Sequence, residues 1–231
     1  MNWQEDAIAG IKKSIPIVVG YAPLGIAFGV IAQKVGLSVL QTGLMSFLVL
    51  SGSGQFIAVA LLASGAEFYS IMLTVMLVNS RYLLFSASLA THVKKISTWL
   101  QTILSFGITD ETYAVNISYL GENEANPSFM MGVNLPAHLS WTINSIIGAS
   151  LGSLFQNVEK MGLNFALPAM FIALLAILIK EKLALYIAII AALLSTGIFA
   201  MTHNNSNVLI STVIAATVGT VIVVCRQKST S

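Results

Sequence analysis

The stretch from Phe47 to Leu62, "FLVLSGSGQFIAVALL", decides how the chain is interpreted, because its middle does not match its ends. Both ends are apolar enough for a bilayer helix, but glycine and serine alternate in the middle and Gln55 follows. Irregular backbone survives in a membrane only where it lines a cavity or is buried in protein. The stretch predicts a discontinuous helix, with one half from about Ser38 to Leu50 and another starting near Gln55. Close packing by small residues is the alternative.

Composition places the chain in the membrane. Of its 231 residues, 56% are hydrophobic and 9% are charged, and the mean hydropathy is +0.86. Soluble domains are about 25% charged. The net charge of +2 and the lack of a basic run argue against nucleic acid as a partner. One cysteine, Cys225, excludes an intrachain disulfide, and no Cys/His spacing suggests a metal or other cofactor.

The apolar segments predict a single all-α domain over residues 1–231, a polytopic membrane bundle with discontinuous helices near the midplane. A span needs about 20 apolar residues. Residues 1–14 are expected to form an amphipathic lead-in at the membrane surface. Seven spans remain possible, but we predict eight: 15–32, 38–64, 68–90, 99–120, 129–155, 163–179, 183–201 and 208–224.

Orientation follows from the basic residues of the connections. With eight spans and the N-terminus inside, six basic residues lie in the cytoplasm and four outside, a small positive-inside bias. A re-entrant opening stretch would flip the later connections. The four expected outside are Lys34, Lys94, Lys95 and Lys160.

Polar residues concentrate between residues 20 and 145, so we expect the substrate pathway in 15–155 and scaffold or partner-facing helices in 163–224. The helix start after "SGSG" would present N–H groups to an anion, with Ser51, Ser53 and Gln55 beside it.

The third predicted span carries Asn79 and Arg81 near its middle. An arginine there is costly and should face the bundle interior with a partner, as a substrate ligand or in a structural ion pair. Residues two apart on a helix point to nearly opposite sides, so both reach one site only if the helix is distorted.

The fourth predicted span supplies two acids, Asp110 and Glu111, about 17 Å from Trp99 along a helix. Adjacent residues diverge by about 100°, so the two carboxylates should serve different neighbours. If Arg81 neutralises one acid, the other is surplus. A surplus acid in a membrane can carry a proton or meet a substrate ammonium.

In the fifth predicted span, polar side chains recur on one helical face that would line a cavity or a protein contact. His138 lies on this face as a candidate proton relay, although such a histidine often only satisfies a neighbour. The face comprises Asn134, His138, Trp141 and Ser145.

Four segments in this order resemble the AzlC family, the large subunit of bacterial branched-chain amino-acid exporters: "PIVVGYAPLGIAFGVIAQKVGLS", "LMSFLVLSGSGQFIAVALL", "NSRYLLFSASL" and "ITDETYAV". The resemblance implies export of leucine, isoleucine, valine and methionine across the bacterial cytoplasmic membrane. It also implies proton antiport and a small hydrophobic AzlD-type partner subunit. Family motifs place Ser51, Ser53, Gln55, Asn79, Arg81, Asp110 and Glu111 at the site.

Two other functions are compatible with the sequence. An uncoupled channel could be built from half-helices. An intramembrane hydrolase could use Ser53 and His138, but a nucleophile elbow needs glycine two residues to either side, where Ser51 and Gln55 lie. We therefore expect a transporter without catalytic residues.

Overall fold

The computed structural model describes residues 3–154 and 182–202, together with residues 165, 172, 179, 211, 214, 215 and 217–222. The chain divides into two compact units, Met1–Pro168 and Ala169–Ser231. Every regular element in the described residues is a helix, as the sequence predicts.

Two long helices, α1 (Trp3–Lys34) and α8 (Pro127–Leu151), form the spine of the first unit. They run parallel, because Gly10 lies against Gly132 near one end and Gly29 against Gly148 near the other. A Cβ on any of these glycines would collide with the opposite backbone, so small residues permit the close approach. The lead-in predicted for residues 1–14 is not a separate element, since α1 continues through it.

Two short helices, α2 (Val39–Val49) and α3 (Gly52–Ala63), replace the predicted span 38–64. The break is confirmed: Leu50 is left-handed, with φ 42°, and the Ser51 hydroxyl accepts a hydrogen bond from the Gly54 N–H to cap α3. The second half begins at Gly52 rather than near Gln55. Helices of 11 and 12 residues are about 16–18 Å long, roughly half the bilayer core.

A second break divides the predicted span 99–120 into α6 (Thr98–Phe106) and α7 (Asp110–Leu120). The prediction of one unbroken helix here is wrong. Thr109 has extended backbone and forms a capping box with Thr112, which starts a new helix. The two acids therefore occupy the first turn of α7, where the helix dipole favours negative charge.

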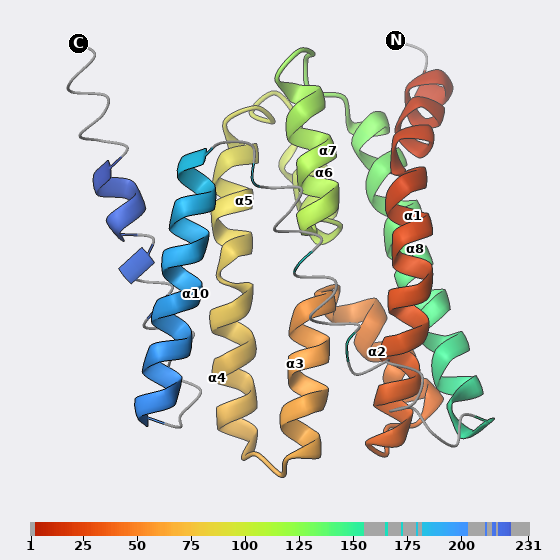
Figure 1. The fold of residues 1–231 in the computed structure, drawn as a ribbon. Coiled ribbons are helices and arrows are strands. Elements are labelled where there is room, and N and C mark those ends of the chain that lie inside the picture. Colours follow the sequence, from red (N-terminus) through yellow and green to blue (C-terminus); the bar gives the residue numbers. More distant parts are fainter. Residues whose placement is uncertain are drawn as a thin grey trace. The chain divides into compact units, whose positions relative to one another are not determined.

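Each pair of short helices forms a hairpin that returns to its starting side (Figure 1). The first hairpin (α2 and α3) lies in the lower half of the view, and the second hairpin (α6 and α7) lies in the upper half. Lys95, before α6, forms a 2.9 Å ion pair with Glu124, after α7, so both ends of the second hairpin lie together. We describe both hairpins as re-entrant.

The helices α4 (Phe68–Asn79) and α5 (Arg81–Ala90) connect the two hairpins with only Ser80 between them. The order of helices then repeats with opposite direction. The second hairpin's α7 begins 58 residues after α3 (110 − 52), and α8 begins 59 residues after α4 (127 − 68). The order helix, hairpin, helix thus occurs twice, as α1–α4 and as α5–α8, in inverted orientation, as in many secondary transporters.

Length and composition identify two described helices as membrane-spanning candidates, Trp3–Lys34 and Phe68–Ala90, so the count of eight spans is not confirmed. The hairpins change the predicted sides. The connection between α5 and α6, which carries Lys94 and Lys95 and was expected opposite the N-terminus, lies at the same end of the first unit as the start of α1 (Figure 1).

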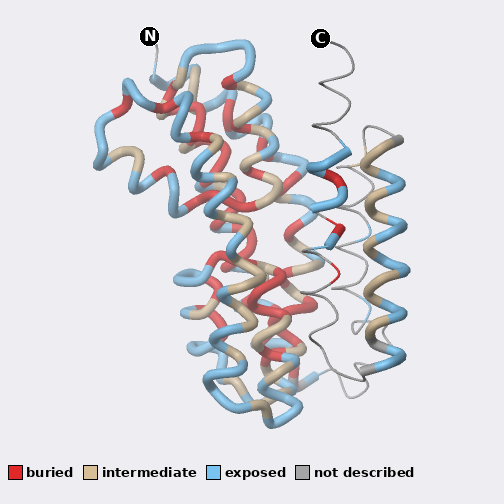
Figure 2. Tube along the Cα trace, turned by 90° about the vertical axis from the view of Figure 1, so that its left-hand side faces the viewer, coloured by how far each residue is buried: buried red, intermediate tan, exposed pale blue. Residues whose placement is uncertain are grey.

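Buried residues concentrate inside the first unit, and exposed residues lie both at its end connections and on the outer faces of its helices (Figure 2). The 3₁₀ turn Gly152–Leu154 follows α8. In the second unit, α10 (Lys182–Thr202) matches the predicted span 183–201, and Gly219 packs against its Ile187. The predicted span 163–179 and the ends of 208–224 lie almost wholly outside the described residues.

Candidate functional site

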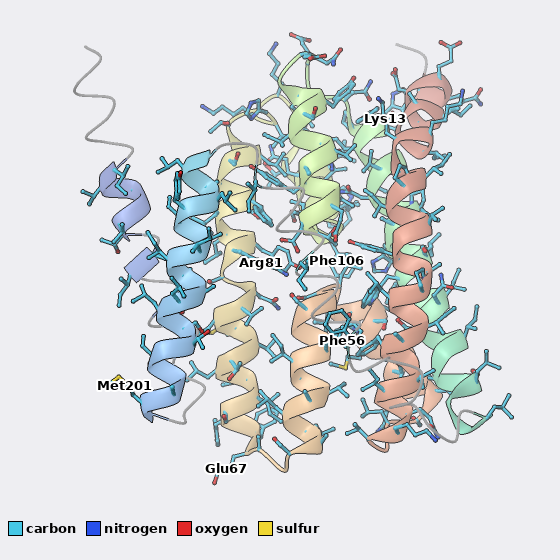
Figure 3. The ribbon with its side chains drawn as sticks, in the orientation of Figure 1. Lys13, Phe56, Glu67, Arg81, Phe106 and Met201 are labelled. Carbon is cyan, nitrogen blue, oxygen red and sulfur yellow. The ribbon has the colours of Figure 1, made fainter. Side chains whose placement is uncertain are left out.

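The tips of the two hairpins meet the junction of α4 and α5 at middle height in the first unit. Arg81 and Phe106 lie at this level, while Glu67 is at the lower edge and Lys13 is towards the top (Figure 3). Two helix starts, those of α3 and α7, thus point their partial positive charge at one region.

The start of α3 has backbone N–H groups that can bind an anion. The Ser51 hydroxyl satisfies the Gly54 N–H at 3.2 Å, whereas the amides of Gly52 and Ser53 precede it and have no intrahelical carbonyl. Ser51 and Ser53 are buried. The arrangement is a helix N-terminus, which favours a carboxylate or other anionic group.

Both polar residues of the third predicted span reach this helix start. Ser51 donates a 2.6 Å hydrogen bond to Asn79 Oδ1, and Arg81 Nη2 donates one of 2.5 Å to Ser53 Oγ. The helix is interrupted at Ser80, and both side chains reach α3, so the distortion that the sequence required for a shared site is present.

The two acids serve different partners, as adjacent helical positions predict. Arg81 Nη2 lies 3.0 Å from Asp110 Oδ2, with 25% and 17% of the two side chains exposed. Tyr21 Oη lies 2.5 Å from Glu111 Oε2. No ion pair to Glu111 exists among the described residues, so Glu111 is the surplus acid of the site.

Sequence reasoning missed Tyr21. The side chain is 7% exposed on α1, and its hydroxyl also lies 2.8 Å from Oγ1 of Thr109, the cap of α7. A buried tyrosine needs a hydrogen-bond partner, and Tyr21 lies within the apolar run "IPIVVGYAPLGIAF". That requirement was the available signal.

Gln55 lies beside the site but is fully occupied. Its Nε2 donates to Ser46 at 3.1 Å, and its Oε1 accepts from Trp141 Nε1 at 2.8 Å. The side chain is completely buried. Gln55 therefore ties the first hairpin to α8 instead of presenting its amide to the pathway. The indole of Trp141 also packs edge-on against Tyr21 at 5.4 Å between ring centroids.

The polar face predicted on α8 makes protein contacts with both hairpins. Asn134 Nδ2 donates to the Leu104 carbonyl at 3.0 Å, and Asn134 Oδ1 accepts from Asn116 at 2.9 Å. Trp141, on the same face, binds the first hairpin. The helix α8 is thus the common support of both breaks.

His138 lies on this face but outside the network. It is 6% exposed, and neither ring nitrogen has a hydrogen-bond partner in the described residues. Its neighbours are the rings of Phe47 and Phe106, at 5.0 and 5.6 Å between centroids. The same side chains line a cavity of about 180 Å³. The structure does not bring His138 to the two acids.

A serine–histidine dyad is not formed either. The Ser53 hydroxyl accepts from Arg81, and His138 contacts aromatic rings. In the described part of the chain, no group of three or more His, Cys, Asp or Glu side chains could hold a metal ion.

Opposed half-length hairpins whose tips meet at an ion pair define a class, the α-helical membrane proteins built on discontinuous helices. Residues 16–155 match the family model described as AzlC protein. The chain belongs to the AzlC family.

Relatives support the same placement. The Inner membrane protein YgaZ of Escherichia coli is 32% identical over 83% of this chain and 82% of its own. The Branched-chain amino acid transport protein AzlC of Bacillus subtilis is 30% identical over 75% of this chain and 70% of its own. An uncharacterised membrane protein of Archaeoglobus fulgidus is 30% identical over 72% and 73%. No solved structure matches the chain.

Proposed function

We propose that this chain is the large subunit of a secondary-active exporter in the bacterial cytoplasmic membrane. It moves leucine, isoleucine, valine and methionine out of the cell by proton antiport, with a small AzlD-type membrane subunit. Family membership and the name of the Bacillus subtilis relative support amino-acid transport. The name of the Escherichia coli relative supports the location.

One observation carries the proposal: an anion-favouring helix start contacts Arg81 of the ion pair, and Glu111, which has no ion-pair partner among the described residues, follows Asp110 on α7. The amides of Gly52 and Ser53, with Arg81 beside them, suit the carboxylate of a zwitterion. Glu111 suits its ammonium group, or the proton exchanged for it.

The ion pair between Arg81 and Asp110 assigns the two acids different roles. Asp110 holds Arg81 in place, so its charge is already balanced. Glu111 can bind a proton or an ammonium group without breaking a salt bridge. Alternating access around this site would follow from exchange between the two inverted halves.

The test is efflux of preloaded radiolabelled leucine from vesicles that hold this chain with its small partner. Efflux should rise when a pH gradient is imposed, and Glu111→Gln should abolish that response. A leucine flux that ignores the gradient in the wild type would favour the uncoupled facilitator. Absence of flux for all four amino acids would contradict the proposal.

A further inference from the structure

The Tyr21 hydroxyl contacts two side chains, and its single proton can be donated to only one of them at a time. Its Oη lies 2.5 Å from Glu111 Oε2 and 2.8 Å from Thr109 Oγ1. A phenol donates one hydrogen bond, so Tyr21 donates to one neighbour and accepts from the other. An ionised Glu111 only accepts, and the Tyr21 proton must then point to it.

The hydrogen bonds continue beyond Thr109 to the break in the second hairpin. Thr109 Oγ1 lies 3.3 Å from Thr112 Oγ1, and Thr112 donates to the Gly107 carbonyl at 2.9 Å. Tyr21, Thr109 and Thr112 are all buried, which keeps bulk water from replacing these bonds.

We propose that Tyr21 and Thr109 are positioning residues that transmit the protonation state of Glu111 to the break between α6 and α7. The inference rests on the proposed function only in its use of Glu111 as the coupling acid. With Glu111 ionised, Thr109 donates to Tyr21 and Tyr21 donates to Glu111. When Glu111 takes a proton from water, it donates to Tyr21, and Tyr21 then donates to Thr109.

The reversal changes the cap of α7. Thr109 must then direct its own proton to Thr112, which gives one directed chain from Glu111 to the Gly107 carbonyl. The hydroxyl that accepts from the Thr112 N–H to start α7 therefore changes its other partner with the charge of Glu111. The second hairpin thereby senses the coupling acid at its own break.

Other charged and ionisable groups surround Glu111. Asp110 precedes it on α7 and pairs with Arg81 of α5, Tyr21 of α1 contacts it, and Tyr82 of α5 lies near Tyr21. Arginine stays charged, and a scan from about pH 5 to about pH 8.5 stays below the range in which tyrosines ionise. Asp110→Asn controls for the remaining carboxylate, and His138→Gln controls for the imidazole that ionises in this range on the Trp141 face of α8.

The test uses Trp141, whose indole packs against Tyr21 at 5.4 Å. The chain has three tryptophans, so Trp3→Phe with Trp99→Phe leaves Trp141 as its single tryptophan. Fluorescence of the full chain in lipid vesicles, with its small partner, should change with pH. Glu111→Gln should remove the change, and Tyr21→Phe should move its midpoint upward by about one pH unit, since a hydrogen bond to the ionised carboxylate is lost.

Tyr113→Phe is the matched control. It removes a tyrosine hydroxyl on α7, the helix that carries Glu111, and this hydroxyl donates to Ser88 at 2.9 Å. It should leave the midpoint unchanged. Equal midpoints for Tyr21→Phe and wild type, or a full change retained in Glu111→Gln, would overturn the inference.

Efflux supplies the second readout. Thr109→Ser keeps the hydroxyl and should keep gradient-driven leucine efflux, whereas Thr109→Val should lower it about tenfold while Trp141 still titrates at the wild-type midpoint. Equal efflux in these two variants would remove Thr109 from the proposal. The fluorescence titration needs no substrate, so it decides the role of Tyr21 even if leucine is not transported.

Discussion

The two hairpins share a geometry and differ in chemistry. Each has two short helices, a break and a hydroxyl cap, Ser51 in the first and Thr109 in the second. The first tip, "SGSGQ", has no charge of its own and receives Arg81 from α5. The second tip, "TDET", carries both acids. The caps and glycines set the shape, and the residues after each cap set what the tip can bind.

The largest expected effect comes from removing the link between the tips. Arg81→Gln leaves Asp110 in a mostly buried site without its cation, and losing one partner of such a pair costs about 3 kcal/mol. Leucine efflux should fall at least about 100-fold, and the melting temperature in detergent should drop. The double variant with Asp110→Asn should recover the melting temperature but not the efflux. If Arg81→Gln melted at the wild-type temperature, the ion pair between Arg81 and Asp110 would not contribute to stability.

A smaller effect on stability is expected from alanine at the glycines near the two breaks, Gly54 and Gly107. A Cβ on Gly107 would lie 2.6 Å from Asn134 Cβ, which is fixed to the backbone of α8. A Cβ on Gly54 would lie 2.7 Å from the Ser51 hydroxyl, which can move without a backbone shift but only by weakening its cap of α3. Gly107→Ala should therefore destabilise the chain by about 2–3 kcal/mol and Gly54→Ala by about 1 kcal/mol.

Gly20 provides the control for these glycines, because a Cβ there meets nothing within 4 Å. Gly20→Ala should leave stability equal or raise it. Thermal unfolding of the three variants in one detergent compares them directly. A larger loss of stability for Gly54→Ala than for Gly107→Ala would contradict the expectation that the second tip is the more tightly packed.

The smallest effect is expected at the ends of the second hairpin. The hydrogen bond from Lys95 holds the pKa of the exposed Glu124 carboxylate below its usual value. The pair therefore adds stability above the usual glutamate pKa and loses it as pH falls through the lowered value. Both side chains are more than 80% exposed, so Glu124→Gln should leave the melting temperature unchanged within error at pH 7. A clear drop in the melting temperature would show that the pair helps to hold the two ends of the second hairpin together.

Much of the first tip could be predicted from the sequence, because its signals are local. Alternating glycine and serine predicted the break, and two polar residues on either side of Ser80 predicted the distortion between α4 and α5. The divergence of Asp110 and Glu111 followed from helix geometry alone. The predictions for the break and for the junction at Ser80 needed only the rule that polar groups in a membrane must find partners.

The second hairpin could not be predicted in the same way. The segment from Trp99 to Leu120 has the length of one crossing, and length cannot distinguish one crossing from two half-length helices. Its break has a single glycine, Gly107, and depends on the capping box of Thr109. Tyr21 was missed because its partners are about 90 residues away in the chain.

The central claim is that both hairpins are re-entrant and enter from opposite sides, and cysteine accessibility tests it most directly. Cys225→Ser removes the native thiol, and single cysteines are then placed at Lys34, Glu67, Lys95 and Glu122. A membrane-impermeant maleimide applied to vesicles of known orientation should label Lys34→Cys and Glu67→Cys from one side, and Lys95→Cys and Glu122→Cys from the other. Labelling of Lys34→Cys and Glu67→Cys from opposite sides would mean that the first hairpin crosses the membrane and would contradict the account.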